Sequence, residues 1–244
     1  MTIRRIIATS GGFLPTPNYE VVQPGATITE ALRLTGKVRP RVCLVHTATG
    51  DDPARYARGY DALQRAGCDV THLELFTMPT HNPVDVLTSS DLVWVGGGSV
   101  ANLLAVWRTH RVDEAMAEAW NAGVILGGVS AGSLCWHLGG ATDSFGPTLQ
   151  PISNGLGLLP YANGVHYDSE EQRRPLIHEL IGNGTFEVAM CTDDRVGILY
   201  EGTDPVRVIT DVEVDATTGP AAYRVTRTGG EVVETRLGPG AITS

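Results

Sequence analysis

Residues 124–133 read Val-Ile-Leu-Gly-Gly-Val-Ser-Ala-Gly-Ser, and this stretch decides how the rest of the chain is interpreted. Its Gly128–Gly132 portion is a G-x-S-x-G pattern between an apolar strand and a helix, which is typical of a nucleophile elbow. Such an elbow is a strained turn that lifts the Ser130 hydroxyl above a sheet, and the flanking glycines relieve the crowding. The amide of Ala131 then points to where a carbonyl oxygen becomes negative. The pattern alone also fits an ordinary tight turn, but its setting favours the elbow.

The chain before the elbow alternates between strand and helix patterns. Expected strands are Ile3–Thr9, Arg41–His46, Val70–Leu75, Leu92–Val95 and a strand beginning at Val124–Leu126. Expected helices are Thr27–Thr35, Asp52–Ala66, Val100–Thr109 and Asp113–Asn121. The run Leu92–Val95 is continuously apolar, which is typical of a strand covered on both faces. Repeated strand–helix–strand units predict right-handed crossovers and an α/β fold with a mainly parallel sheet.

The end of the chain has a different pattern. Residues Val206–Ile242 are rich in Thr and Val, with turn signals at Gly219, Gly229–Gly230 and Gly238. This stretch predicts C-terminal β-hairpins that close the edge of the sheet. No internal repeat or low-complexity linker divides the 244 residues, so we expect a single α/β domain over residues 1–244.

Composition narrows the class of protein. The sequence is 42% hydrophobic, which is enough for a core and excludes wholesale disorder. Lys and Arg number 18 against 27 Asp and Glu, a net charge of -9 with no long basic run. This balance argues against a nucleic-acid or anionic-membrane partner. No stretch approaches about 18 unbroken apolar residues, so we expect no membrane span.

The cysteines indicate the compartment. They are widely scattered, without a C-x-x-C pair, and have apolar neighbours: Cys43, Cys68, Cys135 and Cys191. We expect buried thiols of a reducing compartment rather than a disulfide or zinc scaffold. The N-terminal sequence lacks the apolar length of a secretory signal, so the expected location is cytoplasmic.

A glycine-rich loop follows the strand Leu92–Val95. Residues Gly96-Gly97-Gly98-Ser99 match neither a dinucleotide fingerprint nor a P-loop with its lysine. Glycines at the end of a strand and the start of a helix can donate a backbone amide to an oxyanion; the alternative is a turn without a ligand. The loop and the elbow both fall at carboxyl ends of strands, where parallel sheets bind their ligands.

A serine nucleophile needs a general base. His166, in Gly-Val-His-Tyr-Asp after an expected strand, is the best candidate. His46 ends a strand and is the second candidate, while His137 is expected on a helix, pointing away from the serine. The other four histidines are expected at the surface or at helix ends: His72, His81, His110 and His178.

The acid that orients the imidazole has two candidates. Asp143 lies in Ala-Thr-Asp-Ser, and Asp194 lies in Thr-Asp-Asp-Arg before an expected strand. Only 36 residues (166 minus 130) separate the serine from the histidine. This is too few for the connections of an α/β-hydrolase, so a triad on a different α/β scaffold fits better.

Three motifs together resemble the peptidase E (aspartyl dipeptidase) family of serine peptidases, with cyanophycinase as a more distant relative. They are GGGS-x-x-N-L-L at 96–104, GVSAGS at 128–133, and GLGLLP at 155–160 followed by HYDSE-x-x-R at 166–173. The resemblance covers about residues 1–210. It implies a fold like that of class I glutamine amidotransferases, with serine in place of their cysteine. It also implies hydrolysis of dipeptides with an N-terminal aspartate, without metal or cofactor.

The resemblance also implies roles for individual residues. Ser130 matches the nucleophile, His166 the base, and Asp194 the triad carboxylate, for which Asp143 is the alternative. The oxyanion donors are then the amides of Ala131 and of Gly97 or Gly98. Arg173 matches an arginine that reads the substrate's aspartyl carboxylate as a bidentate fork; its alternative is a helix-surface arginine.

Some positions depart from the family pattern. Ser99 and Val100 replace an asparagine and a threonine near the substrate, Val165 replaces a proline, and Asp194 replaces a glutamate. None removes the nucleophile or base, but together they weaken the case for strict aspartyl specificity.

The predicted activity is therefore acyl transfer by a serine dipeptidase on a small peptide, in a monomer or homodimer. The same triad would serve an esterase or amidase, and the scaffold could instead be a catalytically silent binding module. A glutaminase-like transferase is disfavoured because the elbow carries serine instead of cysteine.

Overall fold

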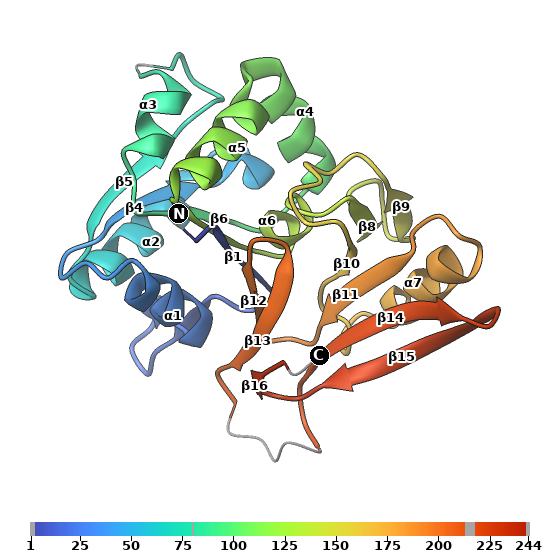
Figure 1. Ribbon diagram of the computed structural model, residues 1–244. Helices are drawn as coiled ribbons and strands as arrows, with labels where there is room; N and C mark the ends of the chain where they lie inside the picture. Colours follow the sequence, from blue (N-terminus) through green and yellow to red (C-terminus); the bar gives the residue numbers. More distant parts are fainter. Residues whose placement is uncertain (1–2, 80, 213–217, 243–244) are drawn as a thin grey trace.

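The computed structural model describes residues 3–79, 81–212 and 218–242. Its main sheet has eight strands in the order β16-β13-β12-β1-β7-β6-β4-β5 (Figure 1). The strands of this sheet are β1 Arg5–Thr9, β4 Arg41–Val45, β5 Asp69–Leu73, β6 Leu92–Val95, β7 Ile125–Val129, β12 Val196–Glu201, β13 Asp204–Thr210 and β16 Gly240–Ala241. The run from β1 to β5 is parallel, and β12, β13 and β16 continue it antiparallel. The expected mainly parallel α/β sheet is confirmed.

Helices cover both faces of the main sheet (Figure 1). The helices are α1 Ala26–Leu34, α2 Pro53–Arg65, α3 Pro83–Thr88, α4 Val100–His110, α5 Val112–Ala122, α6 Ala131–Leu134 and α7 Arg173–Gly182, with a 3-10 turn η1 at Thr47–Thr49. Alternate side chains of one strand enter opposite cores. In β6, Val93 and Val95 join the core of α4 and α5, whereas Leu92 and Trp94 join that of α1 and α2. Burial on both faces explains the unbroken apolar run.

A second sheet of six strands lies beside the first, in the order β15-β14-β11-β10-β8-β9. Its strands are β8 Gly139–Thr142, β9 Gln150–Ile152, β10 Ala162–Gly164, β11 Val188–Thr192, β14 Ala222–Thr228 and β15 Glu231–Leu237. Helix α7 packs on it through Ile177 and Ile181. Met190 and Ala222 of this sheet share a buried cluster with the main sheet; the single-domain organisation stays a prediction.

The C-terminal hairpins differ in part from the expectation. Hairpin β14–β15 turns at Gly229–Gly230, as predicted, but it extends the second sheet. Strands β13 and β16 extend the main sheet instead. The Thr- and Val-rich pattern therefore predicted the antiparallel strands, but not that they extend the edges of two different sheets. A short hairpin of β2 Phe13–Pro15 and β3 Val22–Pro24 and the helix α3 were not anticipated.

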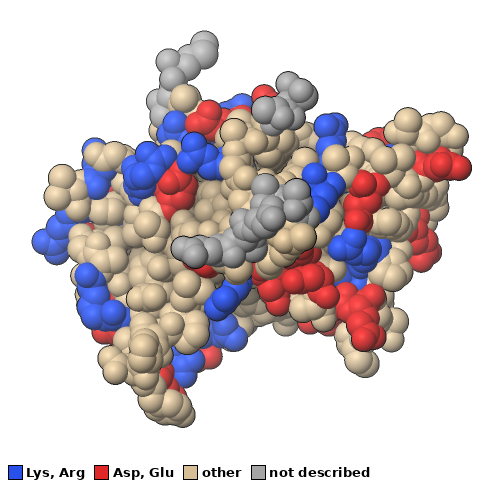
Figure 2. All heavy atoms as spheres, turned by 90° about the horizontal axis from the view of Figure 1, so that it is seen from below, with Lys and Arg blue, Asp and Glu red and all other residues tan. Residues whose placement is uncertain are grey.

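The burial of the cysteines and the mixed charge of the surface agree with what the composition predicts. The four cysteines are buried and unpaired. Within the described residues, no helix combines the length and apolar character needed to cross a bilayer. On the face shown in Figure 2, basic residues are interspersed with acidic ones, and acidic residues gather toward the right of the view. The absence of nucleic-acid and membrane partners, the oligomeric state and the location stay predictions.

Candidate active site

Ser130 lies on a strained turn between β7 and α6. Its backbone has φ 58° and ψ -114°, a positive φ that is uncommon outside glycine and often found at functional sites. Its N–H donates to the Thr9 carbonyl at 3.0 Å, and its carbonyl accepts the amides of Ser133 and Leu134, each at 2.9 Å. These backbone bonds hold the turn in place without using the Ser130 side chain.

The flanking glycines are required by close packing. A Cβ on Gly128 would lie 2.3 Å from the Gly132 oxygen, and one on Gly132 would lie 2.3 Å from the Val95 oxygen. Backbone atoms occupy the space that side chains would need, so both positions demand glycine. The crowding expected at an elbow is therefore present on both sides of Ser130.

The glycine loop after β6 packs against the elbow. A Cβ on Gly97 would lie 3.1 Å from the Ser130 Cβ, so the loop borders the serine. Gly98 has φ 137°, and a Cβ there would meet the Ala48 oxygen at 2.4 Å. The Ser99 hydroxyl caps helix α4 by accepting the Asn102 amide at 3.2 Å. Its proposed contact with substrate stays a prediction.

His166 and Asp194 form a hydrogen-bonded pair. Nδ1 of His166 lies 2.5 Å from Oδ1 of Asp194, and the two side chains are 23% and 45% exposed. His166 follows β10 and, like Ser130, has a positive φ, of 52°. The Asp194 amide donates to the Asp168 carboxylate at 2.8 Å. With Nδ1 engaged, Nε2 is the nitrogen left to exchange a proton with another group.

The end of β1 connects the elbow with the histidine turn. The Thr9 carbonyl accepts the Ser130 amide, and the Ser10 hydroxyl accepts the His166 amide at 2.9 Å. Ser10 Oγ also lies 2.6 Å from Thr192 Oγ1. Among the described residues, no hydrogen bond joins the Ser130 hydroxyl to the imidazole. Such contacts are often loose without substrate. Sequence reasoning missed Ser10, whose only signal is a polar residue between a strand and two glycines.

Two other histidines near the elbow are buried and neutral. His46 is 6% exposed with both ring nitrogens unpaired, and a Cβ on Gly96 would lie 2.3 Å from its Nδ1. Burial lowers its pKa to about 4. Burial likewise lowers the pKa of His137 to about 4; its Nδ1 lies 2.9 Å from the Ser133 carbonyl. His137 lies beyond α6, which ends at Leu134, so its expected helical position is wrong.

In the described part of the chain, neither Asp143 nor Arg173 forms a hydrogen bond or ion pair with the His166 imidazole. Asp143 is exposed on the loop after β8, whereas Arg173 is only 2% exposed at the start of α7. The Arg173 guanidinium donates to the Ala141 carbonyl and to the Glu170 carboxylate. The alternative of a helix-surface arginine is therefore wrong, because this side chain is buried. Its role toward substrate stays a prediction.

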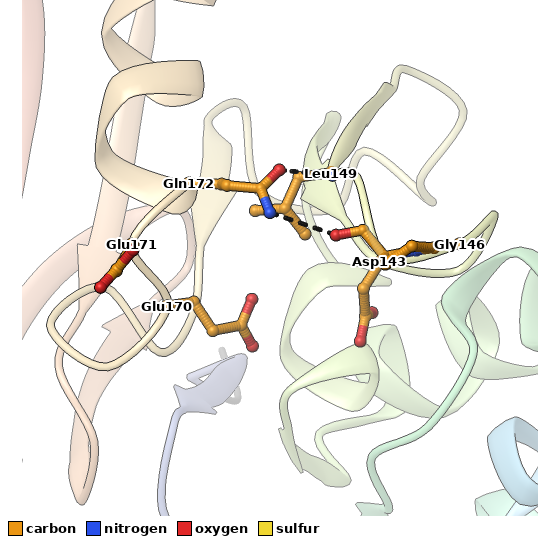
Figure 3. Close-up of a pocket in the computed structure, with 7 residues that line it drawn as sticks. Asp143, Gly146, Leu149, Glu170, Glu171 and Gln172 are labelled. Atoms are coloured by element: carbon orange, nitrogen blue, oxygen red, sulfur yellow. Dashed lines mark hydrogen bonds between the residues drawn. The ribbon is translucent and has the colours of Figure 1, made fainter.

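A cavity of about 590 Å³ opens beside these residues (Figure 3). Its lining residues come from the loop after β8 and the turn before α7: Asp143, Gly146, Pro147, Leu149, Glu170, Glu171 and Gln172. Gln172 joins the two walls, since its amide nitrogen donates to the Pro147 carbonyl and its oxygen accepts the Leu149 amide, each at 3.1 Å. Glu170 was not among the predicted site residues.

Known proteins resemble the chain in sequence. The model for Peptidase family S51 matches residues 6–207. The chain is 35% identical over 206 residues to an uncharacterized peptidase, YgaJ, of Bacillus subtilis, covering 84% of this chain and 86% of that one. It is 31% identical over 128 residues to Peptidase E of Streptomyces coelicolor, covering 52% of this chain and 51% of that one.

Solved structures share the fold. A candidate Peptidase E protein from Listeria monocytogenes aligns with a TM-score of 0.61 at 19% identity, covering 87% of this chain and all (100%) of that one. A peptidase from an acI-B1 Actinobacterium aligns with a TM-score of 0.69 at 15% identity, covering 98% and 96% of the two chains. At these identities the likeness concerns the fold alone.

Proposed function

The chain belongs to peptidase family S51, the family of peptidase E, and on that premise we propose that it is a serine-type dipeptidase using Ser130, His166 and Asp194 as a catalytic triad. The observation that carries the proposal is the His166–Asp194 hydrogen bond at 2.5 Å, attached through Ser10 to the same strand end as the strained Ser130 turn. A nucleophile on an elbow and a carboxylate-oriented imidazole are the two parts that acyl transfer by serine requires.

The proposed reaction has two halves. His166 Nε2 accepts the Ser130 proton as Oγ attacks the scissile carbonyl, and the imidazolium gains support from Asp194. The same nitrogen then protonates the leaving amine, so that the peptide bond breaks and an acyl-enzyme remains. Water repeats the sequence on the ester, releasing the acid and the free serine. His46 and His137 are poor rivals for this role, because burial holds their pKa at about 4.

The oxyanion site in this proposal comes from backbone amides. The Ala131 amide follows the nucleophile directly, and Gly97 of the glycine loop packs against Ser130. Loss of a single oxyanion donor typically lowers the rate by about 10²–10³-fold. The packing of Gly97 on the serine supports a contribution from the loop comparable with that of the base.

The more specific prediction, that the substrate has an N-terminal aspartate, comes from the family resemblance. A cation is needed to recognise the aspartyl carboxylate, and Arg173 is the residue that the resemblance implies. Here both terminal nitrogens of Arg173 already donate within the protein. The proposal therefore rests on dipeptide hydrolysis, and the aspartyl preference implied by the resemblance is tested separately.

Hydrolysis of a dipeptide panel tests the proposal. Asp-Leu, Asn-Leu and Lys-Leu are incubated with wild type, Ser130→Ala and the exposed-serine control Ser153→Ala. At least one dipeptide should be cleaved by wild type and by the control, with turnover lost in Ser130→Ala. Retained activity in Ser130→Ala would refute the nucleophile. Cleavage of aryl esters but of no dipeptide would favour the esterase alternative.

A further inference from the structure

The cavity beside Asp143 adjoins both proposed catalytic elements. One wall begins a single turn after the base, where the Glu170 amide donates to the His166 carbonyl at 3.1 Å. The other wall contacts the helix that follows the glycine loop, since the Ala101 amide donates to the Ser144 hydroxyl at 3.3 Å. A peptide whose scissile carbonyl lies at the elbow therefore has this cavity within reach of its N-terminal residue.

The walls of the cavity are already joined without a ligand. Gln172 bridges them through its two bonds to Pro147 and Leu149 (Figure 3). A volume of about 590 Å³ lies within the range of small-molecule sites. The space is therefore preformed and large enough for one long side chain.

The charge of the cavity is negative. Figure 3 shows the carboxylates of Asp143 and Glu170 directed into the same opening, and Glu171 also lines the cavity. Among the described residues that line it, none is Lys or Arg. A substrate carboxylate in this cavity would meet negative charge on two sides. A substrate cation would meet an oppositely charged carboxylate on each of those sides.

Arg173 lies behind this wall. Its side chain is 3% exposed, its guanidinium donates to Glu170 and to the Ala141 carbonyl, and its Nε is buried without a partner. Burying an incompletely paired arginine is costly and contributes little to stability. Such an arrangement is kept where a neighbouring group must be oriented. One cation against the three acidic residues that line the cavity leaves a net negative charge for a ligand to balance.

We infer that this cavity holds the N-terminal residue of the peptide and that Glu170, oriented by Arg173, selects together with Asp143 a cationic side chain, lysine or arginine. Aspartate is disfavoured there. Arg173 is a positioning residue in this account, not a substrate ligand. The inference rests on the proposed peptidase function and names its substrate class.

The test compares substrates that differ only in charge. Lys-Leu is set against norleucine-Leu, its neutral isostere, and Asp-Leu against Asn-Leu, with kcat/KM for each. We expect Lys-Leu to exceed norleucine-Leu, and Asn-Leu to exceed Asp-Leu, by at least about tenfold. Glu170→Gln should reduce the Lys-Leu advantage at least about fivefold, acting through KM and leaving norleucine-Leu unchanged. The matched control Glu179→Gln, exposed on α7 and outside the cavity lining, should keep the wild-type preference.

Binding to Ser130→Ala separates this inference from the proposed function. Calorimetry with the same four dipeptides reports recognition without turnover. Preference for Lys-Leu over norleucine-Leu, lost in Ser130→Ala/Glu170→Gln, supports the inference even if catalysis uses another nucleophile. Equal binding of the two, or tighter binding of Asp-Leu than of Asn-Leu, overturns the inference while leaving the triad intact.

Discussion

Replacement of Asp194 by Asn should lower kcat by at least about 30-fold with little change in KM. The carboxylate lies 2.5 Å from His166 Nδ1 and supports the imidazolium formed during acyl transfer. Opposite charges about 4 Å apart interact by about 4 kcal/mol at an effective dielectric constant of about 20. Because the Asp194 side chain is 45% exposed, we keep about half, ~2 kcal/mol, which corresponds to about 30-fold in rate. An amide can also hold the wrong tautomer, so this figure is a lower bound.

The assay is steady-state hydrolysis of the best dipeptide substrate, with Asp143→Asn measured in parallel. Asp143 has no bond to the imidazole and faces the cavity, so its variant should alter KM for charged substrates and keep most of kcat. The reasoning is refuted if Asp143→Asn loses the larger share of kcat while Asp194→Asn stays near wild type. That outcome would make Asp143 the acid of the triad.

Three further predictions follow from the packing around the site. Ser10→Ala should lower kcat about tenfold, since the His166 amide loses its acceptor, and Ser10→Thr should restore it; equal activity of all three proteins would exclude this positioning role. Gly97→Ala places a Cβ 3.1 Å from that of the nucleophile and should lower kcat at least about tenfold in steady-state assays without unfolding the protein, as circular dichroism would verify; wild-type kcat would argue against the loop. Burial lowers the pKa of His46 and of His137 from 6.5 to about 4, so the folded state resists protonation that the unfolded state accepts. The contribution of the two neutral histidines to the free energy of unfolding is fully present above pH 6.5 and declines as pH falls toward 4. By pH 5 each histidine has lowered the free energy of unfolding by about 2 kcal/mol. Urea unfolding at pH 7 and pH 5 measures this loss, and a constant unfolding free energy over that interval would contradict it.

The main sheet was predictable because its strands are buried on both faces. Continuous apolar runs such as Leu92–Val95 and regular helices between them identify a parallel sheet directly. The elbow was equally clear from its G-x-S-x-G pattern. The structure shows why the pattern is informative, because Gly128 and Gly132 have no room for a side chain. The position of His166 after a strand also agrees with the structure, in which it follows β10, and its catalytic role stays a prediction.

The second sheet was not predictable in the same way. Strand β10 is only Ala162–Gly164, and β9 is only Gln150–Ile152, too short for a periodic pattern. Their pairing is tertiary, as is the burial of Arg173 against Glu170, which no local pattern distinguishes from a surface ion pair. The acidic cavity arises only when residues near 145 and 171 meet, so its charge could not be read from either segment alone.

The most direct test of the account is covalent labelling of the serine. Wild type is treated with a fluorophosphonate, which reacts with activated serine nucleophiles, and the adduct is located by peptide mass spectrometry. The account predicts one adduct, on Ser130, that is lost in Ser130→Ala and strongly slowed in His166→Gln. An unlabelled Ser130, or labelling that is indifferent to His166, would contradict a catalytic serine activated by this histidine.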